Sequence, residues 1–144
     1  MLRKSILVIS DQHAPYHHID TLDFLSAIKE KYKPDCVVNI GDEMDWHSIS
    51  FHDSHPGLYS PSHELVVAKK FFKQLEELFP KQYVMDSNHG SLVFRKATRH
   101  GMPHEIFKSY NHMLGVGKSW SWHEDLVIKA SNGQKIYFCH GKYK

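Results

Sequence analysis

Residues 36–45 read Cys36-Val37-Val38-Asn39-Ile40-Gly41-Asp42-Glu43-Met44-Asp45 and join an apolar run to an acidic turn. The first half is short, apolar and β-branched, which is typical of a fully buried strand. Glycine then permits a tight turn, and acidic residues follow directly. We therefore expect Asp42 to stand at the carboxyl end of a strand, where open α/β sheets gather their ligands.

Three other polar motifs follow apolar runs in the same way. They are Asp11-Gln12-His13 after residues 6–9, Asn88-His89 after residues 83–85, and His140-Gly141 after residues 136–139. Oxygen and imidazole groups at four strand ends predict one shared site. Because Asp, Asn and His together suit divalent ions such as Mn²⁺, Fe²⁺ and Zn²⁺, that site is expected to bind metal.

The surrounding pattern predicts an α/β fold with mixed sheets and flanking helices. Strands are expected over 4–10, 35–40 and 82–86, with helices over 21–32, capped by Asp20, and from Ser60-Pro61 to about 79. The strand–helix–strand order favours parallel, right-handed crossovers. Residues 92–114 are expected to form two shorter helices broken at 101–103. Strands over 125–130 and 134–139 are expected to form a hairpin through Asn132-Gly133.

Composition places the chain among ordinary globular proteins. It has 144 residues, 41% hydrophobic, with a formal net charge of +2, which neither supports nor excludes a polyanionic partner. Cys36 and Cys139 lie in predicted strands, so we expect free thiols in a reducing compartment. The apolar run near the N-terminus is too short for a signal peptide or a membrane span. We therefore expect one cytoplasmic domain over 1–144, with its oligomeric state open.

The spacing of the polar residues suits a pair of metal ions. Asp11 and His13 can grip one ion, and a carboxylate at Asp42, with both oxygens free on its turn, can bridge two ions about 3.5–4 Å apart. Asn88 and His140 add an amide oxygen and an imidazole. Such a pair polarises a phosphoryl group and lowers the pKa of a bound water. His89 is then free to face the substrate and to protonate a leaving oxygen.

These motifs, in this order, resemble the calcineurin-like metallophosphoesterase superfamily, whose pattern runs D-x-H, G-D-x-x-D, G-N-H-D/E, H and G-H-x-H. The resemblance spans residues 5–141. It implies that Asp11 and His13 bind one metal, that Asp42 bridges, and that Asn88 and His140 bind the second. It also implies that His89 faces the substrate and that Asp45 supports the turn of the second motif.

Three departures from the family pattern stand out. Ser87 replaces the usual glycine before Asn88, and Gly90 replaces the acidic residue that orients the histidine in the family. The final G-H-x-H motif does not occur within the 144 residues, which predicts a C-terminally truncated domain or a degenerate relative. A further alternative is that His17, His47 or His52 substitutes for one of the missing imidazoles.

The predicted activity is hydrolysis of a phosphate ester with two divalent metal ions, Mn²⁺ first and Fe, Zn or Ni as alternatives. A phosphomonoester is favoured, from a phosphorylated small molecule, nucleotide or phosphoprotein. The alternatives are a nuclease or phosphodiesterase, with nucleic acid as partner, and a non-catalytic binding protein. Arg95 and Arg99, with Lys96, either contact substrate phosphate or form a solvated basic face. Trp46, Trp120 and Trp122 either stack on a base or belong to the core.

Overall fold

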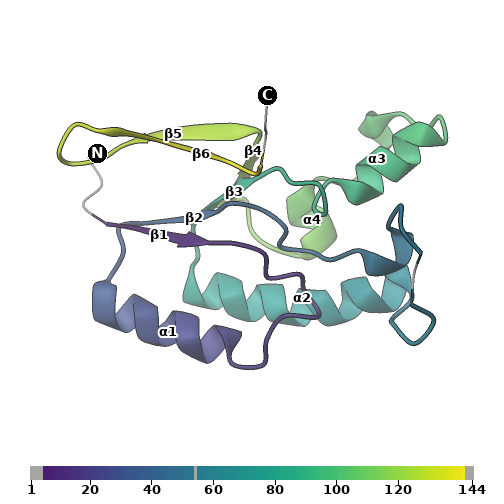
Figure 1. The fold of residues 1–144 in the computed structure, drawn as a ribbon, viewed down its shortest axis with the longest axis horizontal. Coiled ribbons are helices and arrows are strands. Elements are labelled where there is room, and N and C mark those ends of the chain that lie inside the picture. The colour runs from purple at the N-terminus through teal and green to yellow at the C-terminus, as the bar shows by residue number, and fades with distance from the viewer. Residues whose placement is uncertain (1–4, 54, 142–144) are drawn as a thin grey trace.

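A four-stranded parallel sheet forms the centre of the molecule (Figure 1). The computed structural model describes residues 5–53 and 55–141. The sheet has the order β1 (Ile6–Ile9), β2 (Cys36–Asn39), β3 (Gln82–Met85) and β4 (Trp120–His123). Ile9 pairs with Asn39 and Met85 with His123, so the strands end together at one edge. The three predicted parallel-type strands are present, and the predicted α/β class is confirmed.

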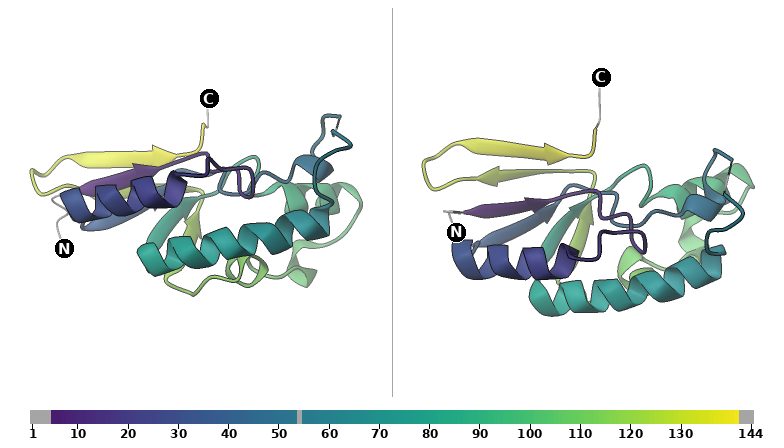
Figure 2. Two further views of the ribbon diagram at one scale, coloured as in Figure 1. Left: turned by 90° about the horizontal axis from the view of Figure 1, so that it is seen from below. Right: turned by 60° about the horizontal axis from the view of Figure 1, so that its bottom comes forward.

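Two helices, α1 (Thr21–Tyr32) and α2 (Pro61–Leu78), cover one face of this sheet (Figure 2). Their core includes Leu25, Phe72 and Leu75, which pack with Ile9 and Val84 of the strands. α2 begins as predicted, with Pro61 in its first turn and the Ser60 side chain accepting from the backbone N–H of His63. α1 begins at the predicted residue, but the predicted cap is wrong.

The Asp20 side chain makes no capping hydrogen bond to α1. Instead the hydroxyl of Thr21 donates to the carbonyl of His18 at 2.7 Å, and the backbone carbonyl of Asp20 accepts from the N–H of Phe24. The exposed Asp20 carboxylate lies 3.6 Å from the ring of His18. The first turn of α1 is therefore closed by backbone and hydroxyl groups.

A two-stranded antiparallel sheet, β5 (Asp125–Lys129) and β6 (Lys135–Cys139), lies over the other face (Figure 2). Phe138 packs there against Cys36, Val38 and Met85. The hairpin prediction is confirmed, and Gly133 adopts a φ of +87° in its turn. The fold therefore has three layers: helices, parallel sheet and hairpin.

The connection from β3 to β4 differs from the sequence prediction. It contains α3 (Leu92–Arg99), the 3-10 turn η2 (His104–Ile106) and the short helix α4 (Tyr110–Leu114), so the second predicted helix is split. Pro103 precedes η2, and Ser109 caps α4 by accepting from the N–H of His112. β4 itself was not predicted, because its residues Trp120–His123 carry no β-branched apolar run. No helix among the described residues is long and apolar enough to span a bilayer.

Candidate active site

The loops after β1 and β2 run side by side beyond the ends of their strands. The N–H of Asp11 donates to the carbonyl of Gly41 at 3.0 Å, and the N–H of His13 donates to the carbonyl of Asp42 at 2.9 Å. These bonds continue the parallel pairing of the two strands. The first two polar motifs are therefore held in fixed register at the carboxyl edge of the sheet.

Three of the predicted ligands have left-handed backbone conformations. The φ angles are +53° at Asp11, +46° at His13 and +53° at Asp42. Residues with a Cβ rarely adopt this region, and holding one there costs on the order of 1–3 kcal/mol. Such residues cluster at functional sites, where the surrounding structure over-determines their geometry. The strain at these three positions marks the loop ends as a candidate site.

The three histidines of the site share one tautomeric arrangement. Nδ1 of His13 lies 2.8 Å from Oδ1 of Asp45, Nδ1 of His89 lies 2.5 Å from the Asp45 carbonyl, and Nδ1 of His140 lies 2.7 Å from the Ile40 carbonyl. Since each of these oxygens only accepts, each Nδ1 carries the hydrogen. The lone pair of each neutral ring is therefore on Nε2. Metal-binding histidines have the same arrangement, because their other ring N–H donates to a carboxylate or a carbonyl.

The Asp42 carboxylate lies between His13 and His140. Its Oδ1 accepts from the backbone N–H of His89 at 3.1 Å. Its Oδ2 lies 3.9 Å from Nε2 of His13 and 3.3 Å from Nε2 of His140. The expectation that both oxygens are free is wrong, because the β3 loop engages one of them. A single buried oxygen faces both imidazoles.

The first ligand group comprises Asp11, His13 and Asp42, whose ligand atoms lie within 4.8 Å of one another. Nε2 of His13 is 3.8 Å from Oδ1 of Asp11, and the hydroxyl of Ser10 donates to the other oxygen of Asp11. A second group, His13, Asp45 and His89, meets the same distance limit. Both rings in that group direct their Nδ1–H to Asp45, so Asp45 orients them and Asp11–His13–Asp42 is the better cation site.

The second ligand group comprises Asn88, His140 and Asp42. Nε2 of His140 lies 2.8 Å from Oδ1 of Asn88 as well as 3.3 Å from the Asp42 carboxylate. Nδ1 of His140 already donates to the Ile40 carbonyl, so the lone pair on Nε2 faces two more oxygens, from Asn88 and Asp42. Three groups that all accept are thus directed at one point, which is the arrangement that binds a cation. Mixed imidazole, carboxylate and amide oxygen ligands suit Mn²⁺, Fe²⁺ or Zn²⁺. The residues present therefore fit a divalent metal.

Glu43 lies in the space that the missing acidic residue at position 90 leaves beside the third motif. A Cβ placed on Gly90 would meet Oε1 of Glu43 at 3.0 Å and Oγ of Ser87 at 2.9 Å. Glu43 is fully buried, and Nε1 of Trp122 donates to its Oε1 at 3.2 Å. Burial raises the pKa of Glu43 to about 7. An acidic group from the second motif thus occupies the space beside Gly90, while the Nδ1 of His89 is held by the Asp45 carbonyl.

Ser87 links the second and third motifs. Its hydroxyl oxygen accepts from the backbone N–H of Asp42 at 2.9 Å and from that of Gly90 at 3.0 Å. Serine in place of glycine at position 87 therefore adds hydrogen bonds that connect the loops after β2 and β3. Neither the contact of Glu43 with Trp122 nor the hydrogen bonds of Ser87 were predicted from the sequence. The one available signal was an extra acid beside Asp42 together with glycine at position 90.

The basic residues of α3 and the alternative histidine ligands were the other candidate site residues. Nη1 of Arg95 donates to the Asn88 carbonyl at 3.0 Å, whereas the guanidinium of Arg99 lies 3.9 Å from the ring centre of Phe51. His17 stacks on Phe71 and lines the same hollow as Asp11 and His13. Nε2 of His47 accepts from the N–H of His55, and His52 lines a hollow with His89. The candidate metal groups of the described residues include none of these three histidines.

The tryptophans belong mainly to the interior. Trp46 and Trp120 are buried in the core, where Nε1 of Trp120 donates to the carbonyl of Phe79 at 3.0 Å. Trp122 is half-buried, stacks on Tyr110 and donates to Glu43. These contacts favour the core interpretation over base stacking.

Open hollows flank the ligand groups. One of about 490 Å³ is lined by Asp11 and His13. Another of about 380 Å³ lies at Asn88, His140 and Arg95, and a smaller one of about 160 Å³ lies at His89 and Arg95. Solvent and a small ester therefore have access to Asp11 and His13 on one side and to Asn88 and His140 on the other.

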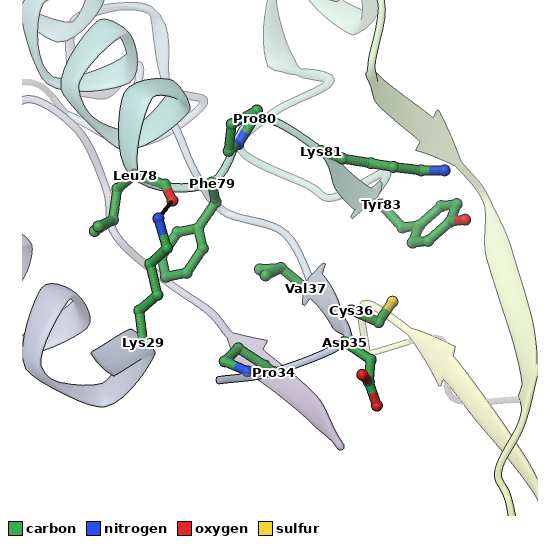
Figure 3. A pocket seen from close by; sticks show the side chains of 10 residues that line it. All are labelled: Lys29, Pro34, Asp35, Cys36, Val37, Leu78, Phe79, Pro80, Lys81 and Tyr83. Carbon is green, nitrogen blue, oxygen red and sulfur yellow. Dashed lines mark hydrogen bonds between the residues drawn. The ribbon is translucent and has the colours of Figure 1, made fainter. Parts of the chain in front are cut away.

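A further pocket, of about 320 Å³, opens at the opposite end of the strands (Figure 3). It is lined by Lys29, Pro34, Lys81 and Tyr83, which lie before or near the starts of β2 and β3. The ammonium of Lys29 donates to the backbone carbonyl of Leu78 at 2.7 Å and so gives the last carbonyl of α2 a hydrogen-bond partner. Neither candidate metal group of the described residues lies there. Both candidate metal groups lie at the carboxyl edge of the sheet.

Replacing Asp45 by Asn tests the orientation of His13. An amide can present its NH₂ to Nδ1, which would favour the wrong tautomer and turn the lone pair away from Asp11. We expect metal affinity to fall roughly 10–100-fold, as for other supporting carboxylates. Titration with Mn²⁺ followed by calorimetry measures this. An unchanged affinity would show that Asp45 does not position His13.

The family model described as calcineurin-like phosphoesterase matches residues 4–144. The chain belongs to this family. The family description names phosphoesterases, and two groups of His and Asp side chains among the described residues, Asp11–His13–Asp42 and His13–Asp45–His89, could hold a metal ion. A solved crystal structure aligns with 91% of the chain at 15% identity and a TM-score of 0.48. The chain spans 50% of that structure's own length. No curated protein matches the sequence.

Proposed function

We propose that this chain hydrolyses a phosphomonoester, of a nucleotide or a phosphoprotein, at a two-metal site centred on Asp42. The observation that supports this most directly is the placement of Asp42 Oδ2 between Nε2 of His13 and Nε2 of His140. One oxygen facing two imidazoles suits a bridging ligand. The proposed ligands on each side of Asp42 line open hollows, which gives an ester substrate access to them.

The proposed ligands are Asp11 and His13 on one side of Asp42, and Asn88 and His140 on the other. Divalent metal bound there, Mn²⁺ first, would supply Lewis-acid stabilisation of the phosphoryl charge and an activated water. The protein's own part is to hold these ligands without rearrangement. The hydrogen bonds behind His13 and His140 and the bond from the His89 N–H to Asp42 do this.

His89 is the proposed proton donor to the leaving oxygen. Its Nδ1–H is engaged by the Asp45 carbonyl, so proton exchange with substrate takes place at Nε2. The ring lies edge-on to His13, with 4.7 Å between ring centres, which limits its rotation. His89 also lines the hollow that Asn88 and Arg95 share. A protonated Nε2 there would be placed beside the substrate.

Replacing His89 by Asn tests this role. We expect kcat for p-nitrophenyl phosphate to fall on the order of 10²–10⁴-fold while bound metal is unchanged, because general acid catalysis is lost without a ligand being removed. Hydrolysis and elemental analysis of the same sample measure the two quantities. His112→Asn is the matched control, since that exposed ring lies on α4. Loss of metal from His89→Asn would contradict the proposed role.

Comparison of p-nitrophenyl phosphate with its bis ester separates the candidate activities. A higher kcat/KM for the monoester supports the phosphatase, and a higher value for the bis ester supports the nuclease or phosphodiesterase alternative. Absence of turnover with bound metal would instead support a non-catalytic binding protein. The same assays with Mn²⁺, Zn²⁺ and Fe²⁺ identify the preferred ion.

A further inference from the structure

We infer that α3 carries a second phosphate-binding site, formed by Arg95, Lys96 and Arg99 around the ring of Phe51, so that the preferred substrate bears a second phosphate group. These four residues are called the Phe51 cluster. The inference rests on the proposed function for the first phosphate. The substrate class inferred is a phosphate ester that carries a second phosphate group.

The three cations of the Phe51 cluster converge on one aromatic ring. The distance to the ring centre of Phe51 is 5.3 Å from Cζ of Arg95, 4.2 Å from Nζ of Lys96 and 3.9 Å from Cζ of Arg99. All lie within the range of cation–π attraction. The ring itself is 39% exposed, so the cluster is at the surface. Three like charges are thus gathered in one place.

The cations of the Phe51 cluster form no ion pair with an acidic side chain in the described part of the chain. The ion pairs found among the described residues join histidines to aspartates, and none includes Arg95, Lys96 or Arg99. Like charges held together repel one another, which raises the free energy of the ligand-free protein. A bound anion would remove that repulsion, so the cluster favours a phosphate ligand.

Arg95 places the Phe51 cluster next to the candidate active site. Its Nη1 donates to the Asn88 carbonyl, and its side chain lines the hollow with His140 as well as the hollow with His89. Arg99 lies four residues further along α3, about 6 Å along the helix axis and on the same face. The cluster therefore extends outward from the ligand group of Asn88 and His140.

The chemistry of the Phe51 cluster suits phosphate. Guanidinium groups bind phosphate oxygens in bidentate fashion. Because contact with the Phe51 ring already orders these side chains, they lose less conformational entropy when phosphate binds. A substrate with one phosphate at Asp42 and another at this cluster would contact both. Nucleotides with two separated phosphates and oligonucleotides share this feature.

Paired substrates test the second phosphate. Adenosine 5′-monophosphate and adenosine 3′,5′-bisphosphate differ by one phosphate, and a 5′-phosphorylated hexathymidylate extends the series to an oligonucleotide. We expect the wild-type protein to prefer the last two. In a Lys96→Gln, Arg99→Gln double variant, that preference should fall roughly 10-fold or more, because two charge-assisted contacts are removed. The control is a Lys70→Gln, Lys73→Gln double variant, which loses the same charge from exposed positions on α2.

Binding without turnover keeps the two proposals separable. Fluorescence polarisation of labelled hexathymidylate, and competition by the bisphosphate, are measured in EDTA for both double variants. Weaker binding in the cluster variant alone supports the inference even where no ester is hydrolysed, in which case only the proposed function fails. Competition identifies the kind of ligand that supplies the second phosphate. If the bisphosphate displaces labelled hexathymidylate at equal phosphate concentration, the ligand is a nucleotide. If hexathymidylate stays bound, the ligand is an oligonucleotide. Equal binding by cluster and control variants would overturn the inference.

Phe51→Leu separates ligand binding from packing. This variant keeps an apolar side chain but loses the ring that gathers the cations. We expect weaker binding of the bisphosphate, a smaller loss for the monophosphate, and a Tm within a few degrees of the wild type. Equal losses for both ligands together with a lowered Tm would show that the cluster only packs α3 against the loop, and would overturn the inference.

Discussion

Asp42→Asn is expected to abolish hydrolysis and to weaken metal binding in both ligand groups. Oδ2 of Asp42 faces His13 at 3.9 Å and His140 at 3.3 Å, so the substitution removes the one negative oxygen shared by both. Loss of several kcal/mol of charge stabilisation corresponds to a fall on the order of 10³-fold or more in kcat/KM. Turnover of p-nitrophenyl phosphate and the number of Mn²⁺ ions per chain are the two measurements.

The matched control for this variant is Asp23→Asn, which neutralises an exposed acid in the first turn of α1. It should retain activity and metal content. Asp42 also accepts a hydrogen bond from the His89 N–H, and an amide oxygen can still accept it, so the loop should persist. Circular dichroism checks this. Retained turnover with two ions in Asp42→Asn would rule out the shared-ligand arrangement.

Gly41→Ala is expected to be the most destabilising substitution near the site. Gly41 has a φ of +106°, and an added Cβ would lie 2.5 Å from Cβ of Ser87 and 2.8 Å from Nδ1 of His140. Backbone strain and overpacking together should lower the free energy of unfolding by roughly 2–5 kcal/mol. Urea denaturation measures this change. Activity should fall as well, because relief of the clash moves His140 away from Asp42.

Gly101→Ala separates the two causes of that loss. Gly101 also has a positive φ, +76°, but an added Cβ there would have no atom within 4 Å. Its cost should be limited to the backbone term, about 1–2 kcal/mol. If Gly41→Ala costs no more than Gly101→Ala, the packing of Ser87 and His140 against Gly41 is not as tight as the structure indicates.

Prediction from the sequence succeeded where local pattern and chemistry agree. Short apolar runs predicted the first three parallel strands, Ser60-Pro61 predicted the start of α2, and Asn132-Gly133 predicted the hairpin turn. It failed at β4, where Trp120 and Trp122 alternate with polar residues over only four positions, too short a run to identify a strand. Pairing with β3 makes that segment a strand, and pairing is a long-range property.

The grouping of Asp11, His13, Asp42, Asn88 and His140 followed from the sequence, because parallel strands bring their carboxyl ends to one edge. The orientation of each ligand did not. The hydrogen-bonded partner of each Nδ1 comes from a segment distant in sequence, such as Asp45 for His13 and Ile40 for His140. Likewise, engagement of one Asp42 oxygen by the β3 loop has no local signal.

The amino-acid sequence by itself determined the α/β class, the family resemblance and the residues that meet at the strand ends, because these depend on residue type, spacing and strand direction. Only the tertiary structure decided that Glu43 lies where Gly90 leaves space, and that Phe51 gathers the cations of α3. Both depend on side chains from separate loops meeting at atomic distance. Spacing along the chain carries no information about such contacts until the strands and helices are packed.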